Sequence, residues 1–480
     1  MAGIRQDIAK LGGAWSTTML WYARAVGELR TRAIADRTSW LYLAAIHGIN
    51  PSGWIAQTLF LSTDPTPSRN EQQLMFNQCQ HAGWFFLPWH RGYLAAFEAI
   101  LADWITEQGG PNDWALPYWN YLDTLNPDAR DIPQEFLDST LPGTTDPNPL
   151  ELALRGPAAS LGPQTWIPRD ISLSEQTSET IYTSVPGTLG YGGPISGFTQ
   201  QGNAYGGIES DPHNLVHVMI GGDTTPNPAG WMYDPDFAAL DPIFWVHHCN
   251  IDRLWAAWMT NSSNAQESSQ AWRNGPFPRQ FAMPDPSGGI DIFIPDDTLP
   301  GAPLAPLYDD LFDGTGIIPP TGGPVVAATP TTPISGSSLV GSNKTSITVG
   351  KSPVSSQVTL PSLKAPALLS AGIQRYYLNV EGVRGSPASG VLSVRITAPS
   401  DNVAAFTETL VFFGLGKASA PDGIHAGNGL SSTVEITNQL EILLAGTSES
   451  VDSLEVSLSQ PESDGDRPEI TVDRISIYAR

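Results

Sequence analysis

The sequence predicts a multidomain protein with a mainly α-helical N-terminal domain, containing a central four-helix bundle, and an all-β sandwich as its C-terminal domain. Two observations support this division. All 15 tryptophans lie at or before Trp272, whereas four of the five lysines come after residue 343. Apolar residues follow a helical period upstream, and short β-branched runs dominate downstream. The two compositions and the two periodicities indicate two folding units.

A proline-rich segment lies between these units. Residues 295–333 contain nine prolines together with Gly, Thr and Ser, and this composition favours extended, poorly packed backbone. We therefore assign residues 1–311 to the N-terminal domain, 312–345 to a linker and 346–480 to the C-terminal domain. Runs typical of strands, separated by Gly, Pro, Asn and Asp, predict the antiparallel sandwich. They cover residues 345–349, 375–380, 390–396, 408–413, 433–436, 453–458 and 469–478.

The composition excludes several classes of partner. Against 24 Lys and Arg stand 48 Asp and Glu, a net charge of -24, which repels phosphate backbones and anionic lipid. We therefore expect neither nucleic-acid nor membrane binding. Residues 1–10 lack the pattern of a secretory signal, so we expect a cytoplasmic protein. Two cysteines, Cys79 and Cys249, could form at most one bridge and are expected to be free or modified.

Six of the eight histidines fall into two groups of three, His47, His81 and His90 in the first and His213, His217 and His248 in the second. His213 and His217 lie about 40° apart around a helix and can bind one ion. His81 and His90 lie about 180° apart on a helix, so His81 must come from a loop if both bind one ion. His47 ends a helical run over residues 39–46. Inward-facing ligands from several helices are typical of a metal site in a bundle core.

Each histidine also has an ordinary structural interpretation. A lone helical histidine is more often a satisfied core or surface residue than a ligand, and a pair at i, i+4 still needs a partner. One buried helix is well supported, because His90, Leu94, Phe97, Leu101 and Trp104 form a single apolar stripe after Pro88. Imidazole ligands alone are compatible with copper, zinc, iron or nickel, although an all-nitrogen set without carboxylates favours copper.

Two motifs resemble those of a known family. Residues 81–98, HAGWFFLPWHRGYLAAFE, resemble the first copper signature of tyrosinases, catechol oxidases and molluscan haemocyanins, and residues 241–253, DPIFWVHHCNIDR, resemble the second. The resemblance implies a type 3 centre, in which two copper ions bind O2 between them. It assigns His47, His81, His90, His213, His217 and His248 as ligands. His247 and His248 lie on different faces of one helix, and both faces are equally apolar, so periodicity does not choose between them. The resemblance selects His248 as the ligand and leaves His247 a structural role or one beside the ligands.

The resemblance also suggests roles for other residues. Cys79 matches the Cys-x-His arrangement that fungal tyrosinases and molluscan haemocyanins convert to a thioether with the histidine, here His81; the alternative is a buried free thiol. Arg91, Glu98, Asp252 and Arg253 fit either residues that orient imidazoles or plain ion pairs.

A phenolic substrate would need help in losing its proton. A phenol with a pKa near 10 is ionised only about one part in a thousand at pH 7, so forming the phenolate costs roughly 4 kcal/mol. Glu209 and Asn214 match an acid and an amide that hold a water in the plant enzymes, and we expect this water to act as general base. The alternative is that Asn214 only caps a helix and Glu209 is a surface residue.

The C-terminal domain looks like the shielding domain of latent polyphenol oxidases, so we expect a latent enzyme. One departure is that the Tyr-x-Tyr of the family reads Pro306-Leu307-Tyr308 here. The expected function is ortho-hydroxylation of small monophenols and oxidation of o-diphenols by O2. Two alternatives are an oxidase of catechols or o-aminophenols alone and a haemocyanin-like O2 carrier. The oligomeric state stays open.

Overall fold

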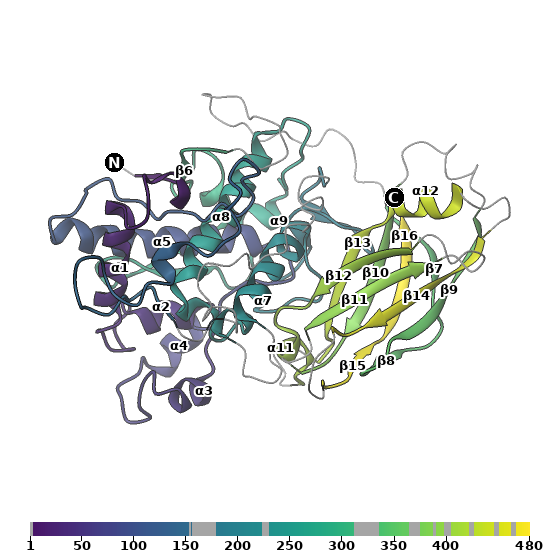
Figure 1. Cartoon of the computed structure of the whole chain (residues 1–480), viewed down its shortest axis with the longest axis horizontal. Coiled ribbons are helices and arrows are strands. Elements are labelled where there is room, and N and C mark those ends of the chain that lie inside the picture. The colour runs from purple at the N-terminus through teal and green to yellow at the C-terminus, as the bar shows by residue number, and fades with distance from the viewer. Residues whose placement is uncertain are drawn as a thin grey trace.

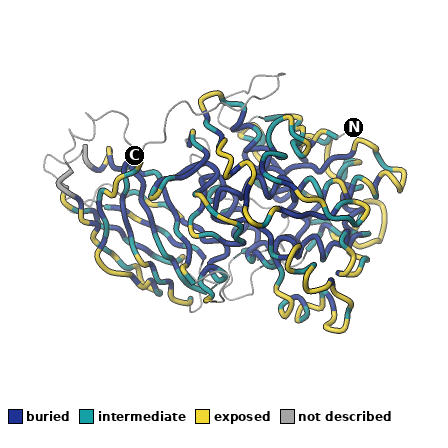
Figure 2. Tube along the Cα trace, turned by 180° about the vertical axis from the view of Figure 1, so that it is seen from behind, coloured by how far each residue is buried: buried dark blue, intermediate teal, exposed yellow. Residues whose placement is uncertain are grey.

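The computed structural model describes residues 3–152, 155, 179–222, 230–311, 336–363, 375–386, 390–397, 405–421, 427–445, 451–461 and 467–480. A helical N-terminal domain and a β-rich C-terminal domain lie side by side (Figure 1). Buried residues run through both domains and up to the boundary between them (Figure 2). The predicted fold class is therefore confirmed.

The N-terminal domain is organised around two long helices, α5 (Phe86–Glu107) and α8 (Pro242–Thr260), which pack against each other. The rings of Phe97 and Trp245 stack across this contact at 3.5 Å. The other α-helices among the described residues of this domain are α1 (Thr17–Leu29), α2 (Trp40–His47), α3 (Pro51–Ala56), α4 (Arg69–Met75), α7 (Leu215–Gly221) and α9 (Gln270–Arg273). Within the described residues, no helix is long and apolar enough to cross a membrane.

Local sequence signals fix where these helices begin. The Ser39 hydroxyl accepts the backbone N–H of Tyr42 at the start of α2, which ends at His47. Asp241 caps α8 by accepting the N–H of Ile243. α5 begins at Phe86, and Pro88 lies in its first turn, where its missing N–H costs no helical hydrogen bond.

Buried ion pairs join α5 to α8 and to the N-terminus. Asp252 accepts hydrogen bonds from Arg91 at 2.6 Å and from Arg5 at 3.1 Å, and Tyr308 donates to the same carboxylate at 2.6 Å. Strand β1 (Ile4–Arg5) pairs in parallel with β6 (Leu307–Tyr308), which brings these residues together. If α5 and α8 moved apart, these charges would be left buried without a partner, which is costly. The ion pairs therefore hold the two helices in one arrangement.

The C-terminal domain is one antiparallel eight-stranded sheet in the order β12-β11-β14-β9-β7-β16-β10-β13. The sheet curls into a nearly barrel-like shape around a single apolar core. Its strands are β7 (Ser338–Ser342), β9 (Val354–Leu363), β10 (Tyr376–Val383), β11 (Val391–Thr397), β12 (Ala405–Val411), β13 (Leu430–Glu435), β14 (Val451–Ser459) and β16 (Arg474–Ala479). A smaller pair, β8 (Ile347–Val349) with β15 (Ile470–Val472), completes the domain.

Four details differ from the prediction. Strand β7 lies inside the segment assigned to the linker, because its Ser- and Gly-rich sequence gives little strand signal; residues 312–335 of that segment lie outside the described residues. Strand β9 was also not predicted. The strand expected to reach residue 413 ends at Val411, and the chain turns there into the short helix α11 (Leu415–Ser419). A second helix, α12 (Thr437–Ala445), adds to the all-β prediction.

Candidate metal centre

The first group of histidines converges in the N-terminal domain. His47 is the last residue of α2, His90 lies in the second turn of α5, and His81 lies in the loop that precedes α5. Their potential ligand atoms and that of Cys79 lie within 4.8 Å of one another, and all four side chains are buried. The position of His81 confirms that it reaches the group from a loop.

The second group comes from α7, α8 and the segment before α7. His213 lies in the short wide turn Glu209–Asn214, His217 lies on α7, and His247 and His248 lie on α8. The potential ligand atoms of these four buried histidines also lie within 4.8 Å of one another. The backbone of Asp211 is non-helical (φ -148°, ψ 122°), so the chain bends just before His213.

The two groups meet face to face. The rings of His90 and His248 stack at a centroid distance of 4.4 Å and an angle of 11°, and the rings of His81 and His213 are 5.7 Å apart. The structure therefore brings all six predicted ligands into one buried pocket.

Backbone carbonyls orient several of these rings. Three of the rings present Nδ1 to a carbonyl oxygen at hydrogen-bonding distance. This contact fixes the proton on Nδ1 and leaves the Nε2 lone pair facing the pocket. The pairs are His47 with Pro235 at 2.9 Å, His90 with Phe86 at 2.8 Å and His217 with Met232 at 2.8 Å.

Electrostatics keep the rings neutral. Burial lowers the pKa of His90 and His217 to about 3, and burial together with neighbouring imidazoles lowers the pKa of His47, His213 and His248 well below the usual value. Because only a neutral imidazole offers a lone pair, all of these rings are ready to bind a metal at neutral pH.

The geometry fits bound metal ions. Two nitrogens on one tetrahedral ion, each at about 2.0–2.1 Å, lie roughly 3.3 Å apart. The Nε2 atoms of His217 and His248 are separated by 3.2 Å. In addition, Nε2 of His47 and Nε2 of His213 are buried without a hydrogen-bond partner. Buried nitrogens with no partner are costly unless a ligand satisfies them, so the donor set suits two ions that prefer imidazole.

His247 adds a fourth imidazole beside the second group. Its Nδ1 lies 3.2 Å from the hydroxyl of Tyr121, and its ring stacks on that of His213 at 5.5 Å. The choice of His248 as the ligand stays a prediction, since both rings border the same space.

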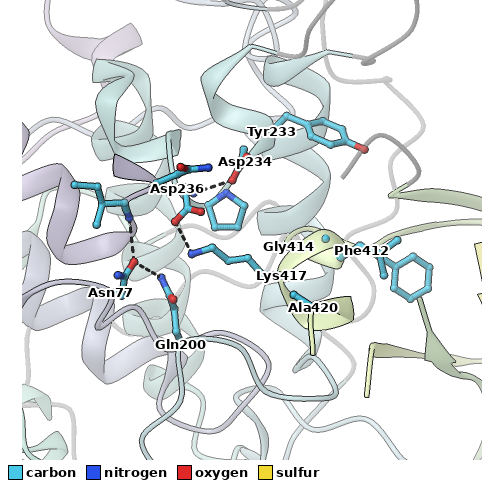
Figure 3. A pocket seen from close by; sticks show the side chains of 14 residues that line it. Asn77, Gln200, Tyr233, Asp234, Asp236, Phe412, Gly414, Lys417 and Ala420 are labelled. Atoms are coloured by element: carbon cyan, nitrogen blue, oxygen red, sulfur yellow. Dashed lines mark hydrogen bonds and ion pairs between the residues drawn. The ribbon is translucent and has the colours of Figure 1, made fainter. Parts of the chain in front are cut away.

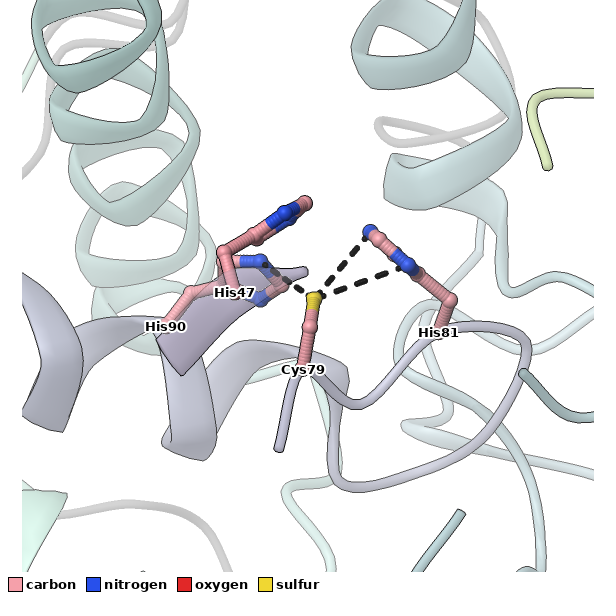
Figure 4. A group of neighbouring side chains, drawn as sticks. All are labelled: His47, Cys79, His81 and His90. Atoms are coloured by element: carbon pink, nitrogen blue, oxygen red, sulfur yellow. Dashed lines mark hydrogen bonds between the residues drawn. The ribbon is translucent and has the colours of Figure 1, made fainter. Parts of the chain in front are cut away.

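The Cys79 sulfur lies against the His81 ring (Figure 4). Sγ is 3.5 Å from Nδ1 and 3.4 Å from Nε2 of His81, so it faces the ring carbon between these two nitrogens. Burial, followed by the charge of Glu209, raises the pKa of the Cys79 thiol well above its usual value. Sγ also lies 3.4 Å from Nε2 of His90, and the thioether to His81 stays a prediction.

Glu209 and Asn214 are both fully buried, which contradicts the alternative of a surface glutamate. The Glu209 carboxylate accepts the backbone N–H of Ala82 at 2.8 and 2.9 Å. Burial raises the pKa of Glu209 well above its usual range, partly opposed by the N–H groups of Ala82 and Gly206. The side chain of Asn214 makes no helix cap; its Oδ1 lies 2.9 Å from Nδ1 of His213.

A residue of the C-terminal domain covers the pocket. The Phe413 ring stacks on His217 at 4.2 Å and approaches His81 and His213 edge-on at 5.4 and 5.8 Å. Phe413 is 1% exposed, and the Tyr205 hydroxyl donates to its carbonyl oxygen at 2.6 Å. No local pattern in the sequence marks this residue, because its place follows from the packing of one domain on the other.

Three of the four charged residues singled out in the two motifs form ion pairs, and Arg253 bonds a neutral amide. Arg91 and Asp252 bond each other, Glu98 accepts from Arg5 at 2.8 Å, and Arg253 donates to Asn250 at 2.9 Å. Carbonyl oxygens, rather than these side chains, orient the histidines described above. The structure therefore supports the ion-pair interpretation for Arg91, Glu98 and Asp252.

The comparisons with known proteins agree with this geometry. Residues 37–261 match the model of the common central domain of tyrosinase, and residues 336–480 match a domain of unknown function, DUF7868. The tyrosinase HcTyr1 of Hahella sp. (strain CCB-MM4) is 31% identical over 502 residues, covering 99% of each chain. A chloroplastic polyphenol oxidase of Malus domestica is 30% identical over 190 residues, 38% of this chain and 30% of that protein.

Solved structures show the same two-domain fold. The structure of latent apple tyrosinase covers 100% of this chain and 97% of its own, with a TM-score of 0.62 at 20% identity. A latent aurone synthase covers 99% and 89%, with a TM-score of 0.62 at 18% identity. With the near full-length relative and the match of the central domain, these findings show that the chain is an enzyme of the tyrosinase and polyphenol oxidase family.

Proposed function

We propose that this enzyme holds two copper ions between its six histidines and uses O2 to hydroxylate small monophenols and to oxidise o-diphenols to o-quinones. The observation that carries the proposal is the convergence of six buried imidazoles in one pocket, kept neutral by burial. Copper heads the affinity order for such nitrogen ligands. When bound, it would supply the redox couple and the binding site for O2.

Glu209 is the proposed proton acceptor for monophenols. Its carboxylate is anchored beside His81 through the Ala82 N–H, and its pKa is raised by burial. A raised pKa brings the base closer to the pKa of the phenol, which makes proton transfer through a water less unfavourable. Asn214 orients His213 and presents its amide nitrogen, which is buried without a hydrogen-bond partner, to bind such a water.

The full-length protein is proposed to be latent. Phe413 occupies the face of His217 on which an aromatic substrate would stack, and its backbone is tied to Tyr205. Substrate can reach the pocket only after the C-terminal domain moves or is removed. The relatives include solved structures described as latent, which supports this part of the proposal.

Cys79 is proposed to form a thioether with His81. The reaction joins Sγ to the facing ring carbon, removes the thiol hydrogen and the ring C–H, and passes two electrons and two protons to O2. The bond would hold the loop histidine as rigidly as the helical ones. Intact mass before and after copper loading tests this step, since the linked chain is lighter by two hydrogens.

The experiment that tests the function compares one monophenol, one catechol and one o-aminophenol on protein from which the C-terminal domain has been trimmed. The proposal expects coloured quinone from the monophenol and the catechol. Oxidation of the catechol or o-aminophenol alone would support the second candidate, an oxidase without monophenol activity. The contact between Asn214 and His213 favours that candidate, because it ties the amide oxygen to a ring instead of a water. No turnover of any substrate would contradict both candidates.

A further inference from the structure

One short segment contacts both groups of histidines. Residues 231–236 supply the carbonyl of Met232, which faces Nδ1 of His217 at 2.8 Å, and the carbonyl of Pro235, which faces Nδ1 of His47 at 2.9 Å. His217 belongs to the second group and His47 to the first. A displacement of this segment would therefore change the orientation of one imidazole in each group.

The C-terminal domain holds the same segment. Lys417 Nζ forms an ion pair with Asp236 Oδ1 at 2.5 Å, with both side chains about 15% exposed. The backbone N–H of Gly390 donates to the Tyr233 hydroxyl at 3.1 Å in a buried hydrogen bond. Figure 3 shows Lys417 reaching from α11 to Asp236. Both residues line a cavity of about 350 Å³ that is formed by residues of both domains.

The chain geometry links this contact to Phe413. Gly414 has a positive φ of 83°, and a Cβ at this position would lie 2.6 Å from the side chain of Gln201 and 3.4 Å from Pro235. This glycine lets the chain turn sharply from Phe413 into α11 while lying against Pro235. The ring that covers the pocket and the ammonium that holds the segment are therefore four residues apart.

The N-terminal domain gives the segment further support. The Trp54 indole donates to the carbonyl oxygen of Asp236 at 2.7 Å, and Tyr233 packs with Val218 of α7 and with Val411 of β12. Loss of the C-terminal contacts would thus leave the segment attached but less restrained. The expected consequence is a change in how firmly the histidines are held, without loss of the fold.

We propose that the C-terminal domain positions the metal centre as well as covering it. Through Lys417 on Asp236 and Gly390 on Tyr233, it fixes the carbonyls of Met232 and Pro235 and so the rings of His217 and His47. Partners of metal-bound histidines typically change metal affinity by about 10–100-fold when removed. The inference rests on the proposed function only in that the histidines hold metal ions.

The test measures release of Cu²⁺ from the full-length protein to a chelator. Lys417→Met keeps the aliphatic stem and removes the charge, and Tyr233→Phe removes only the hydroxyl. Each is expected to release both ions about tenfold faster than wild type, and Lys417→Arg is expected to restore the wild-type rate. The electron paramagnetic resonance spectrum of protein loaded with one Cu²⁺ per chain should also change in Lys417→Met, because it reports ligand geometry.

Tyr205→Phe is the matched control. It removes the hydrogen bond to the Phe413 carbonyl, and therefore loosens the same domain contact, without touching residues 231–236. It should release copper at the wild-type rate. The inference is overturned if Lys417→Met and Tyr233→Phe retain copper as wild type does, or if Tyr205→Phe loses it equally fast. The chelator assay measures copper release without any need for turnover. A failure to oxidise phenols would therefore refute the proposed function, while the release rates would still test this inference.

Discussion

Replacing Phe413 by alanine should activate the full-length enzyme. The ring is 1% exposed and stacks on His217 at 4.2 Å, so it occupies the space that a phenolic ring would need. Truncating a buried phenylalanine removes about 3–5 kcal/mol of packing energy. If all of that energy holds the pocket closed against substrate, the rate at low substrate rises by about 10² to 4 × 10³-fold, since 1.4 kcal/mol is a factor of ten.

The assay is catechol oxidation by copper-loaded, full-length Phe413→Ala, compared with wild type and with trimmed protein. Phe412→Ala is the matched control, because Phe412 is also 1% exposed but packs in the apolar core of the C-terminal domain. We expect Phe413→Ala to approach the trimmed protein and Phe412→Ala to stay nearer to wild type. Equal activation by both variants would show that domain stability, rather than the ring over His217, controls access.

Three further predictions follow from named contacts. Glu209→Gln should lower monophenol oxidation by about 10²–10⁴-fold while lowering catechol oxidation much less, and the ratio of the two rates measures this. Burial in the domain contact raises the pKa of Glu179 to about 7, opposed by the charge of Arg375. In the closed form Glu179 keeps its proton up to about pH 7, whereas an exposed carboxyl releases it near pH 4.5. The closed form is therefore most stable relative to the open form below pH 4.5, and it loses this stability as the pH rises through about 7. Latent activity relative to trimmed protein should therefore rise from pH 5 to 8, and Glu179→Gln should flatten the rise. Asp241→Asn should cost about 3–5 kcal/mol, seen as a lower melting temperature, because it leaves the buried Arg155 charge without its partner.

Local signals in the sequence were enough to predict α2 and α5, but not the turn that carries His213, which was expected on one helix with His217. Ser39 marks the start of α2, and the spacing of His81 and His90 requires a loop between them, as observed. These features depend on neighbours in sequence, where capping and periodicity act.

Features that depend on distant contacts were not predictable. The run that ends in Phe412 and Phe413 has the composition of a strand, and only the packing of the domains places Phe413 over His217. The carbonyls of Met232 and Pro235 orient two rings through backbone atoms, which leave no mark on side-chain identity. Strand β7 gave little signal because it is rich in serine and glycine.

We propose above all that six imidazoles hold two neighbouring copper ions. The most direct test loads the full-length protein with copper, removes loosely bound metal with a chelator, and counts the ions retained per chain by elemental analysis. Two ions per chain are expected for wild type, and His213→Ala should lose tight binding at one site only. Retention of one ion or none by the wild-type chain would contradict it.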